Sequence, residues 1–212
     1  MPTSPYYDSS GKRLPSVTQI LSASWSKGDA LIEWANREGL AGRSHTVARD
    51  IAADAGTASH SLVLERMGGP ASVTGNISDD SMRKAQAAVY HAAPWLARVI
   101  IEPRIVEEAL VSDSLGYGGT PDWYGIIDGK HVVVDIKTGK SIYPQHWVQL
   151  SAYTLLLREL GHPVDETLIV HLPTTLSGHA KTKSMSGDEL LTHIEAWHAV
   201  HALYKLQLTI GF

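Results

Sequence analysis

The sequence contains no cysteine, and this absence excludes several kinds of site at once. A disulfide framework, a thiolate zinc site and a cysteine-ligated iron–sulfur cluster all need thiols. Long apolar runs are also lacking: none approaches the roughly 20 residues that span a bilayer, and the opening "MPTSPYYDSS" has no apolar signal core. We therefore expect a cytoplasmic protein without a membrane partner.

Positive charge is scarce as well. The chain has 18 Lys and Arg against 22 Asp and Glu, which gives a formal net charge of −4. Proteins that coat nucleic acid are usually basic overall, so this balance disfavours a broad electrostatic grip but permits a local site. No linker rich in Gly, Pro or Ser divides the 212 residues. The sequence predicts one domain, residues 1–212.

The first part of the chain, residues 1–102, has mostly helical periodicity. We expect helices over residues 29–38, 44–67 and 79–101. The first ends at Gly39, and the second is interrupted at Gly56, after which Thr57 caps a new helical segment. The third is broken or kinked at Pro94.

Residues 103–212 alternate strands with helices, which predicts a sheet core and a C-terminal helix. The expected strands are "RIVEEALV", "DWYGII", "HVVVDIK" and "TLIVHL". A helix over 144–160 separates the last two, and a capping-box pattern at Ser186 opens the final helix. The fold class predicted is α/β, of the α+β kind.

Two of these strands form a hairpin that places charged side chains together. Asp128-Gly129 is a strong signal for a two-residue type I′ turn. Counting back from that turn puts Asp122 directly opposite Asp135, on one face of the hairpin. Lys137 returns to the same face because strand side chains alternate.

Two opposed carboxylates at this position need a positive partner. At about 4 Å and an effective dielectric of 20, their repulsion is on the order of 4 kcal/mol. Lys137 is the candidate partner, and the neighbouring "GYGGTP" and "TGK" leave room for a ligand. Two carboxylates and a backbone carbonyl suit Mg²⁺ or Mn²⁺. A surface salt-bridge cluster is the alternative.

These residues resemble a known family. The segments "GTPD" (119–122) and "DIKTGK" (135–140) resemble the motif pair of the PD-(D/E)XK nuclease superfamily, in particular its RecB-like exonuclease branch. That branch includes phage recombination exonucleases, CRISPR-associated nucleases and the mitochondrial genome maintenance exonuclease. Three further segments are similar to the branch in the same order: "LPSVTQIL" (14–21), "GTASH" (56–60) and "QLSAY" (149–153).

The resemblance implies a restriction-endonuclease-like α-β-β-β-α-β core and a set of site residues. The implied catalytic residues are Asp122, Asp135 and Lys137. The implied metal ligands are His60, Asp122, Asp135, the backbone carbonyl of Ile136 and Glu108, which is preferred to its neighbour Glu107. Candidate DNA contacts are Gln149, Tyr153, Thr57, Ser16 and Thr18. Many members carry Glu where Asp135 stands, and the missing cysteines exclude the iron–sulfur cluster of some members.

The expected function is metal-dependent hydrolysis of DNA by an exonuclease that uses Mg²⁺ or Mn²⁺ on single strands or DNA ends. The resemblance implies phage-type recombination, repair or DNA processing in a host cytoplasm, with a phage recombination protein and oligomerisation as candidate partnerships. Alternatives are a duplex-specific exonuclease or endonuclease, a non-catalytic nucleic-acid-binding module, and a hydrolase of small phosphorylated molecules. The last is disfavoured because no phosphate-binding G-x-x-x-x-G-K-[ST] loop is present.

Overall fold

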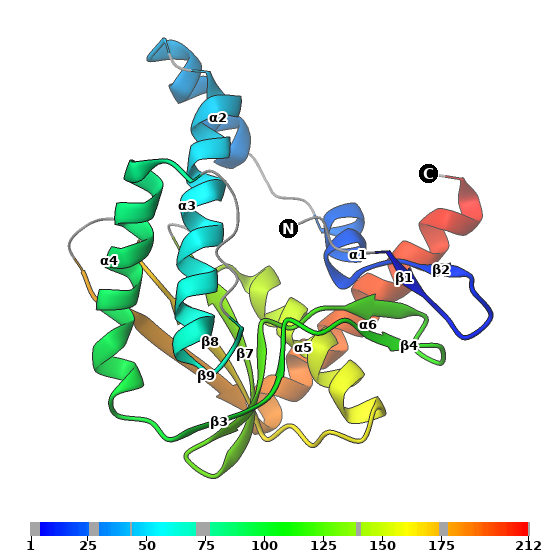
Figure 1. Cartoon of the computed structure of the whole chain (residues 1–212). Coiled ribbons are helices and arrows are strands. Elements are labelled where there is room, and N and C mark those ends of the chain that lie inside the picture. Colours follow the sequence, from blue (N-terminus) through cyan, green and yellow to red (C-terminus); the bar gives the residue numbers. More distant parts are fainter. Residues whose placement is uncertain are drawn as a thin grey trace.

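A five-stranded mixed sheet forms the centre of the protein (Figure 1). The computed structural model describes residues 5–25, 30–42, 44–70, 77–138, 141–173 and 178–211. The strand order is β3 (Ile101–Val106), β6 (Trp123–Ile127), β7 (Lys130–Lys137), β8 (Glu166–His171) and β9 (Lys181–Ser186). Within this sheet β7 and β8 are the one neighbouring pair that is parallel, because helix α5 (Pro144–Glu159) connects them.

Helices cover both faces of this sheet (Figure 1). One face packs against α3 (His45–Arg66) and α4 (Asp79–Leu96). The other packs against α1 (Val17–Ser24), α5 and α6 (Gly187–Ile210), and α2 (Ala30–Leu40) contacts α3. Alternate residues of β7 enter the two cores, with Val133 in one and Val132 and Val134 in the other.

The order of elements through the core confirms the prediction of an α/β fold. After α4 come β3, β6 and β7, then α5 and β8, which is the predicted α-β-β-β-α-β order. Two short sheets lie beside it: β1 (Tyr6–Tyr7) with β2 (Arg13–Leu14), and β4 (Leu110–Ser112) with β5 (Tyr117–Gly119). Neither sheet was predicted, although part of β4 falls within a predicted strand. No described helix is both long and apolar enough to cross a membrane.

The predicted hairpin register is confirmed. Ile127 pairs with Lys130, and the pairing continues without a bulge to Trp123 and Val134. Both turn residues have positive φ, 50° at Asp128 and 81° at Gly129, as a type I′ turn requires. The Asp128 carboxylate also accepts a hydrogen bond from the backbone N–H of Ile100 at 2.9 Å, which ties the turn to β3.

The predicted interruption of the helix at Gly56 and Thr57 is wrong. Helix α3 continues through both residues, so Thr57 caps nothing and is exposed in mid-helix. The glycine serves packing instead, because a Cβ at this position would lie 2.9 Å from Thr138 Oγ1. A glycine inside a helix costs about 1 kcal/mol relative to alanine, and tertiary packing offsets that cost here.

Other expected boundaries also differ. Helix α2 continues through Gly39 to Leu40, and α4 ends at Leu96, two residues after Pro94. The segment "RIVEEALV" divides between β3 and β4, with Glu107 at φ 51° between them. Helix α6 begins where predicted, but the Ser186 side chain makes no capping hydrogen bond.

Candidate active site

Asp122 immediately precedes β6 and is held by two neighbouring elements. Its Oδ2 accepts a hydrogen bond from the backbone N–H of Ile136 at 2.6 Å and lies 2.8 Å from His60 Nε2 on α3. Burial alone would raise the pKa of Asp122, but His60, together with Lys137 and the Ile136 N–H, lowers it below its usual value. Asp122 is therefore a carboxylate at neutral pH.

Asp135 is the most deeply buried acid of the site, with 1% of its surface exposed. Lys137 Nζ lies 2.9 Å from Oδ1, to which it donates, and 2.8 Å from Oδ2. The second contact lacks hydrogen-bond geometry, so Oδ2 accepts no hydrogen bond from any described group. Burial raises the pKa of Asp135 to about 6, although Lys137 opposes the shift.

Each acid thus has its own positive partner. The sequence predicted Lys137 as the cation between the two carboxylates, and the structure places it on Asp135 while His60 takes Asp122. Burial lowers the pKa of His60, but the charges of Asp122, Glu107 and Asp135 outweigh it and raise that pKa above the usual value. His60 is therefore stabilised as a cation when no metal is bound.

Glu107, rather than Glu108, lies beside this cluster. Its Oε1 is 3.6 Å from His60 Nδ1, and its backbone N–H donates to the Asp122 carbonyl at 3.2 Å. Glu108 is exposed, and no hydrogen bond or ion pair joins it to the cluster among the described residues. The structure therefore favours Glu107 over the preferred Glu108 as the additional acid.

Gln149 and Tyr153 extend the site along α5. The amide oxygen of Gln149 accepts from Lys137 Nζ at 3.2 Å, and its nitrogen donates to the Tyr153 hydroxyl at 2.9 Å. One turn of helix separates the two residues, so both face β7. The structure thus brings Asp135, Lys137, Gln149 and Tyr153 into one hydrogen-bonded series.

Gly118 and Gly119 do not leave open space before Asp122, contrary to the sequence-based interpretation, whereas a Cβ at Gly116 would meet no atom within 4 Å. A Cβ at Gly118 would lie 2.5 Å from the Tyr6 ring, and one at Gly119 would lie 2.6 Å from the Tyr153 ring. Tyr6 also hydrogen-bonds Thr120 through its hydroxyl at 2.8 Å. These glycines let two tyrosines pack against the chain, and the room for a ligand lies elsewhere.

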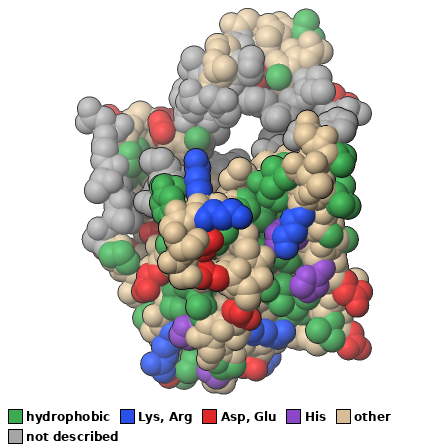
Figure 2. Space-filling view, turned by 90° about the vertical axis from the view of Figure 1, so that its right-hand side faces the viewer, with side chains coloured by type: hydrophobic (Ala, Val, Ile, Leu, Met, Phe, Trp, Pro, Cys, Tyr) green, Lys and Arg blue, Asp and Glu red, His purple; other side chains and the backbone are tan. Residues whose placement is uncertain are grey.

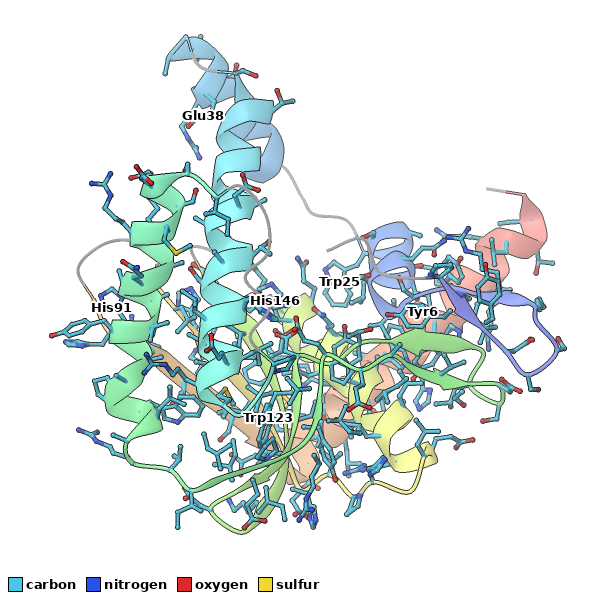
Figure 3. All side chains as sticks on the ribbon, in the orientation of Figure 1. Tyr6, Trp25, Glu38, His91, Trp123 and His146 are labelled. Atoms are coloured by element: carbon cyan, nitrogen blue, oxygen red, sulfur yellow. The ribbon has the colours of Figure 1, made fainter. Side chains whose placement is uncertain are left out.

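A pocket of about 230 Å³ lies beside Lys137. It is lined by Thr18, Leu21, Ser22, Trp25, Lys137, Gln145, His146 and Gln149. Figure 3 shows Trp25 at the end of α1 and His146 near the start of α5. Sequence reasoning missed Trp25 and His146. The four-residue spacing of Gln145 and Gln149 was the available signal, because it puts both on one face of α5.

The remaining candidate DNA contacts have different positions. Thr18 lines this pocket. Ser16 is the N-cap of α1, where its hydroxyl accepts from the Gln19 N–H at 3.0 Å and lies 3.1 Å from Thr18 Oγ1. Thr57 is exposed on α3 away from these contacts. A capping role accounts for Ser16, and Thr18 alone of the three reaches the pocket.

The donor set fits Mg²⁺ or Mn²⁺ in kind but is not arranged around a single point. No group of three or more His, Asp or Glu side chains among the described residues is spaced to hold a metal ion. Each carboxylate is instead paired with a cationic side chain, Asp122 with His60 and Asp135 with Lys137. Asp135 Oδ2 accepts no hydrogen bond but lies 2.8 Å from Lys137 Nζ, so a metal ion at this oxygen would share it with the lysine.

No protein-family model and no curated protein sequence matches the chain significantly. Solved structures are similar at low identity. A candidate exonuclease from Eubacterium rectale is 10% identical, with a TM-score of 0.49, over 74% of this chain and 68% of that one. A phage-related exonuclease from Haemophilus somnus 129PT is 14% identical, with a TM-score of 0.37, over 72% and 81%. An alkaline exonuclease from Laribacter hongkongensis is 14% identical, with a TM-score of 0.35, over 71% and 81%.

Proposed function

We propose that this protein is a metal-dependent deoxyribonuclease that hydrolyses phosphodiester bonds as an exonuclease. The observation that carries the proposal is the Asp135 carboxylate, which is buried beside Lys137 and Asp122 and has one oxygen without a hydrogen bond. Burying a carboxylate is costly even beside an ammonium group, and the pKa of Asp135, raised to about 6, indicates that Lys137 does not fully offset that cost. Such groups are concentrated at functional sites.

The residues of the site have two roles: some would be metal ligands, and one would add negative charge beside them. Asp122, Asp135, His60 and the Ile136 carbonyl would hold Mg²⁺ or Mn²⁺, and Glu107 would add negative charge beside them. When bound, the metal would lower the pKa of a water molecule and polarise the phosphoryl oxygen. His60 must give up its proton before it can act as a ligand, and Asp122 then loses the cation that neutralises it.

Lys137 is the residue that acts on the phosphate. Its ammonium group is held by Asp135 on one side and by Gln149 on the other, which fixes its direction. A fixed positive charge beside the scissile phosphate stabilises the negative charge that develops on the phosphorus oxygens, without reorganisation during the reaction. Gln149 and Tyr153 are positioning residues for this lysine.

The finer assignment is a preference for single strands or DNA ends. The net charge of −4 supports it, since a broad duplex grip recruits many Lys and Arg residues. The face in Figure 2 also shows Lys and Arg side chains interspersed with Asp and Glu. A role in phage-type recombination, repair or DNA processing in the host cytoplasm, with a recombination partner or as an oligomer, rests on the motif resemblance alone.

The test is a time course on end-labelled single-stranded and duplex oligonucleotides with Mg²⁺, Mn²⁺ or EDTA. We expect a metal-dependent ladder that loses orders of magnitude in rate in Asp122→Asn, which removes a ligand charge but keeps the shape of the side chain. The matched control is Asp188→Asn, which changes an exposed carboxylate on α6. Thermal unfolding of each variant separates lost chemistry from lost fold.

Two results would contradict the proposal. Full activity in Asp122→Asn would remove this carboxylate from the active site. Absence of cleavage with every metal, together with tight oligonucleotide binding, would instead indicate a non-catalytic nucleic-acid-binding module. The ladder itself reports strand preference and polarity.

A further inference from the structure

The pocket beside Lys137 has walls of two kinds. Leu21 and the Trp25 indole give it an apolar side, contributed by α1 and the residue that follows it. Hydroxyl, amide and imidazole groups of Thr18, Ser22, Gln145, Gln149 and His146 give it a polar side. A concave site with apolar walls and a few polar groups is typical of a pocket for a small organic group. A phosphate group alone would gain nothing from contact with the apolar side chains of Leu21 and Trp25.

His146 provides a directed hydrogen-bond donor in this pocket. The backbone N–H of Tyr143 donates to its Nδ1 at 3.3 Å, so the proton of the neutral ring resides on Nε2. Burial, with the nearby charges of Lys137 and His171, lowers the pKa of His146 to about 4, which keeps the ring neutral. The amides of Gln145 and Gln149 offer both donors and acceptors. The polar side therefore matches the edge of a nucleobase, which also carries both.

The pocket adjoins the proposed reaction centre directly. Gln149 lines the pocket and accepts a hydrogen bond from Lys137, and Lys137 lines the pocket and pairs with Asp135. A group bound in the pocket is thus joined to Asp135 through two side chains. It belongs to a nucleotide beside the scissile phosphate, not to a distant part of the substrate.

Its size limits what it holds. At about 230 Å³ the pocket lies below the range of roughly 300–1,000 Å³ typical of sites for drug-sized ligands. One base with part of its sugar suits this space, whereas a base pair is about twice as large. A paired nucleotide would first have to leave its partner, which costs unpairing and unstacking energy.

We propose that this pocket binds one unpaired nucleobase of the substrate strand, stacked on Trp25 and adjacent to the scissile phosphate. The inference rests on the proposed function and deepens it by naming the substrate class. The preferred substrate is a single strand or a frayed end, and a fully paired end is cut slowly until it opens. Trp25 and His146 are the specificity-determining residues.

Binding tests the pocket without any metal. Oligonucleotides that carry a single 2-aminopurine are titrated with protein in EDTA, and quenching of the probe reports stacking on an aromatic ring. We expect one probe position to be quenched by the wild type and by Trp25→Phe, but not by Trp25→Leu. We also expect Trp25→Leu to weaken binding about fivefold to a hundredfold, the range for one lost base stack.

Trp147→Leu is the matched control, because Trp147 is partly buried, lies on α5 and packs against the apolar core outside the pocket. It should retain the quenching. Equal quenching in Trp25→Leu and the wild type would overturn the proposal.

Unmodified protein provides a second measurement that does not depend on a variant. Wild type with Mg²⁺ is given single strands in which one abasic residue is moved along the sequence. We expect cleavage to slow about fivefold or more when the abasic residue is adjacent to the scissile bond, and nowhere else. Uniform cleavage at every position would overturn the pocket assignment while leaving the nuclease intact. No cleavage of any strand, with Trp25-dependent quenching retained, would instead overturn the nuclease and leave the pocket.

Discussion

Tyr153 shows how a buried hydroxyl positions a charge through one intervening side chain. It is 3% exposed, and its hydroxyl accepts from the Gln149 amide, whose oxygen holds Lys137. Burial raises the pKa of Tyr153 far above its usual value, so the hydroxyl stays protonated and does not serve as a base. Its contribution is therefore geometric.

Replacement of Tyr153 by Phe removes this acceptor and should loosen Lys137. We expect kcat to fall several-fold with KM unchanged, because the lysine acts on the transition state rather than on binding. Stability should fall by about 1 kcal/mol, the usual cost of one such hydrogen bond. Steady-state kinetics with urea unfolding measures both quantities.

Tyr204→Phe is the matched control, since Tyr204 is a buried tyrosine of α6 that makes no described hydrogen bond to the site. It should leave kcat unchanged. The positioning role would be refuted by a Tyr153→Phe enzyme with wild-type kcat. It would also be refuted if Tyr153→Phe and Gln149→Leu lowered kcat independently, so that the double variant showed the full effect of both substitutions.

The site residues differ in how far a sequence can reveal them. Asp122, Asp135 and Lys137 follow from one turn, because the Asp128-Gly129 signal fixes the register of the whole hairpin. Glu107 does not, because a register shift between Pro103 and Ile105 precedes it and its own φ is positive. A one-residue slip in a strand moves every later side chain to the other face, so the motif spacing that favoured Glu108 could not register this shift.

At the scale of elements, helix α3 comes close to the end of β7 at a glycine, Gly56. Gly56 and His60 lie one helical turn apart and share a face, and Gly56 lies against Thr138 at the end of β7. A Cβ at residue 56 would lie 2.9 Å from Thr138 Oγ1, so the helix or the threonine would have to move. We expect a shift of α3 away from Thr138 to lengthen the 2.8 Å contact between His60 and Asp122.

We therefore expect Gly56→Ala to lower the cleavage rate several-fold, although alanine favours a helix by up to about 1 kcal/mol. The double variant Gly56→Ala with Thr138→Ala should cleave faster than Gly56→Ala alone and approach the rate of Thr138→Ala alone, because the contacting oxygen is gone. Gly39→Ala, in α2 with no atom near its Cβ position, is the control and should gain stability without a change in rate. Cleavage at the wild-type rate by Gly56→Ala would show that this contact does not set the position of His60.

Elements were predictable where periodicity or turn chemistry was strong. The hairpin and α5 were correct, and α6 began where expected. Strand β9 was missed because its "KTKSMS" is an edge strand whose residues are nearly all exposed, so no apolar alternation marks it. The continuity of α3 through Gly56 was missed because it depends on Thr138, which is 82 positions away in the sequence and adjacent only after folding.

At the scale of the whole molecule, α6 joins the site-bearing part of the fold through an aromatic cluster. Trp197 stacks on His201 at 5.6 Å, and its indole N–H donates to the Tyr117 hydroxyl at 3.1 Å. Tyr117 in turn donates to the Ala152 carbonyl of α5. His201 is 7% exposed, and its Nε2 has no described hydrogen-bond partner. The cluster requires a neutral imidazole, because a charged one would be buried without a partner.

This requirement makes stability depend on pH. Burial, with Lys205 and His198 nearby, lowers the pKa of His201 to about 4, against about 6.5 in the unfolded chain. Between these values the unfolded chain binds the proton and the folded chain does not, so stability falls as pH drops through this window and is complete above it. His201→Phe keeps the stacking but cannot titrate. It should reduce the stability lost between pH 7 and pH 5 by on the order of 1 kcal/mol, measured by urea unfolding at both values.

His179→Gln, which replaces an exposed histidine, should leave that loss unchanged. An equal loss in His201→Phe and wild type would place the acid sensitivity elsewhere, with His146 as the next histidine to replace, because its pKa is lowered in the same direction.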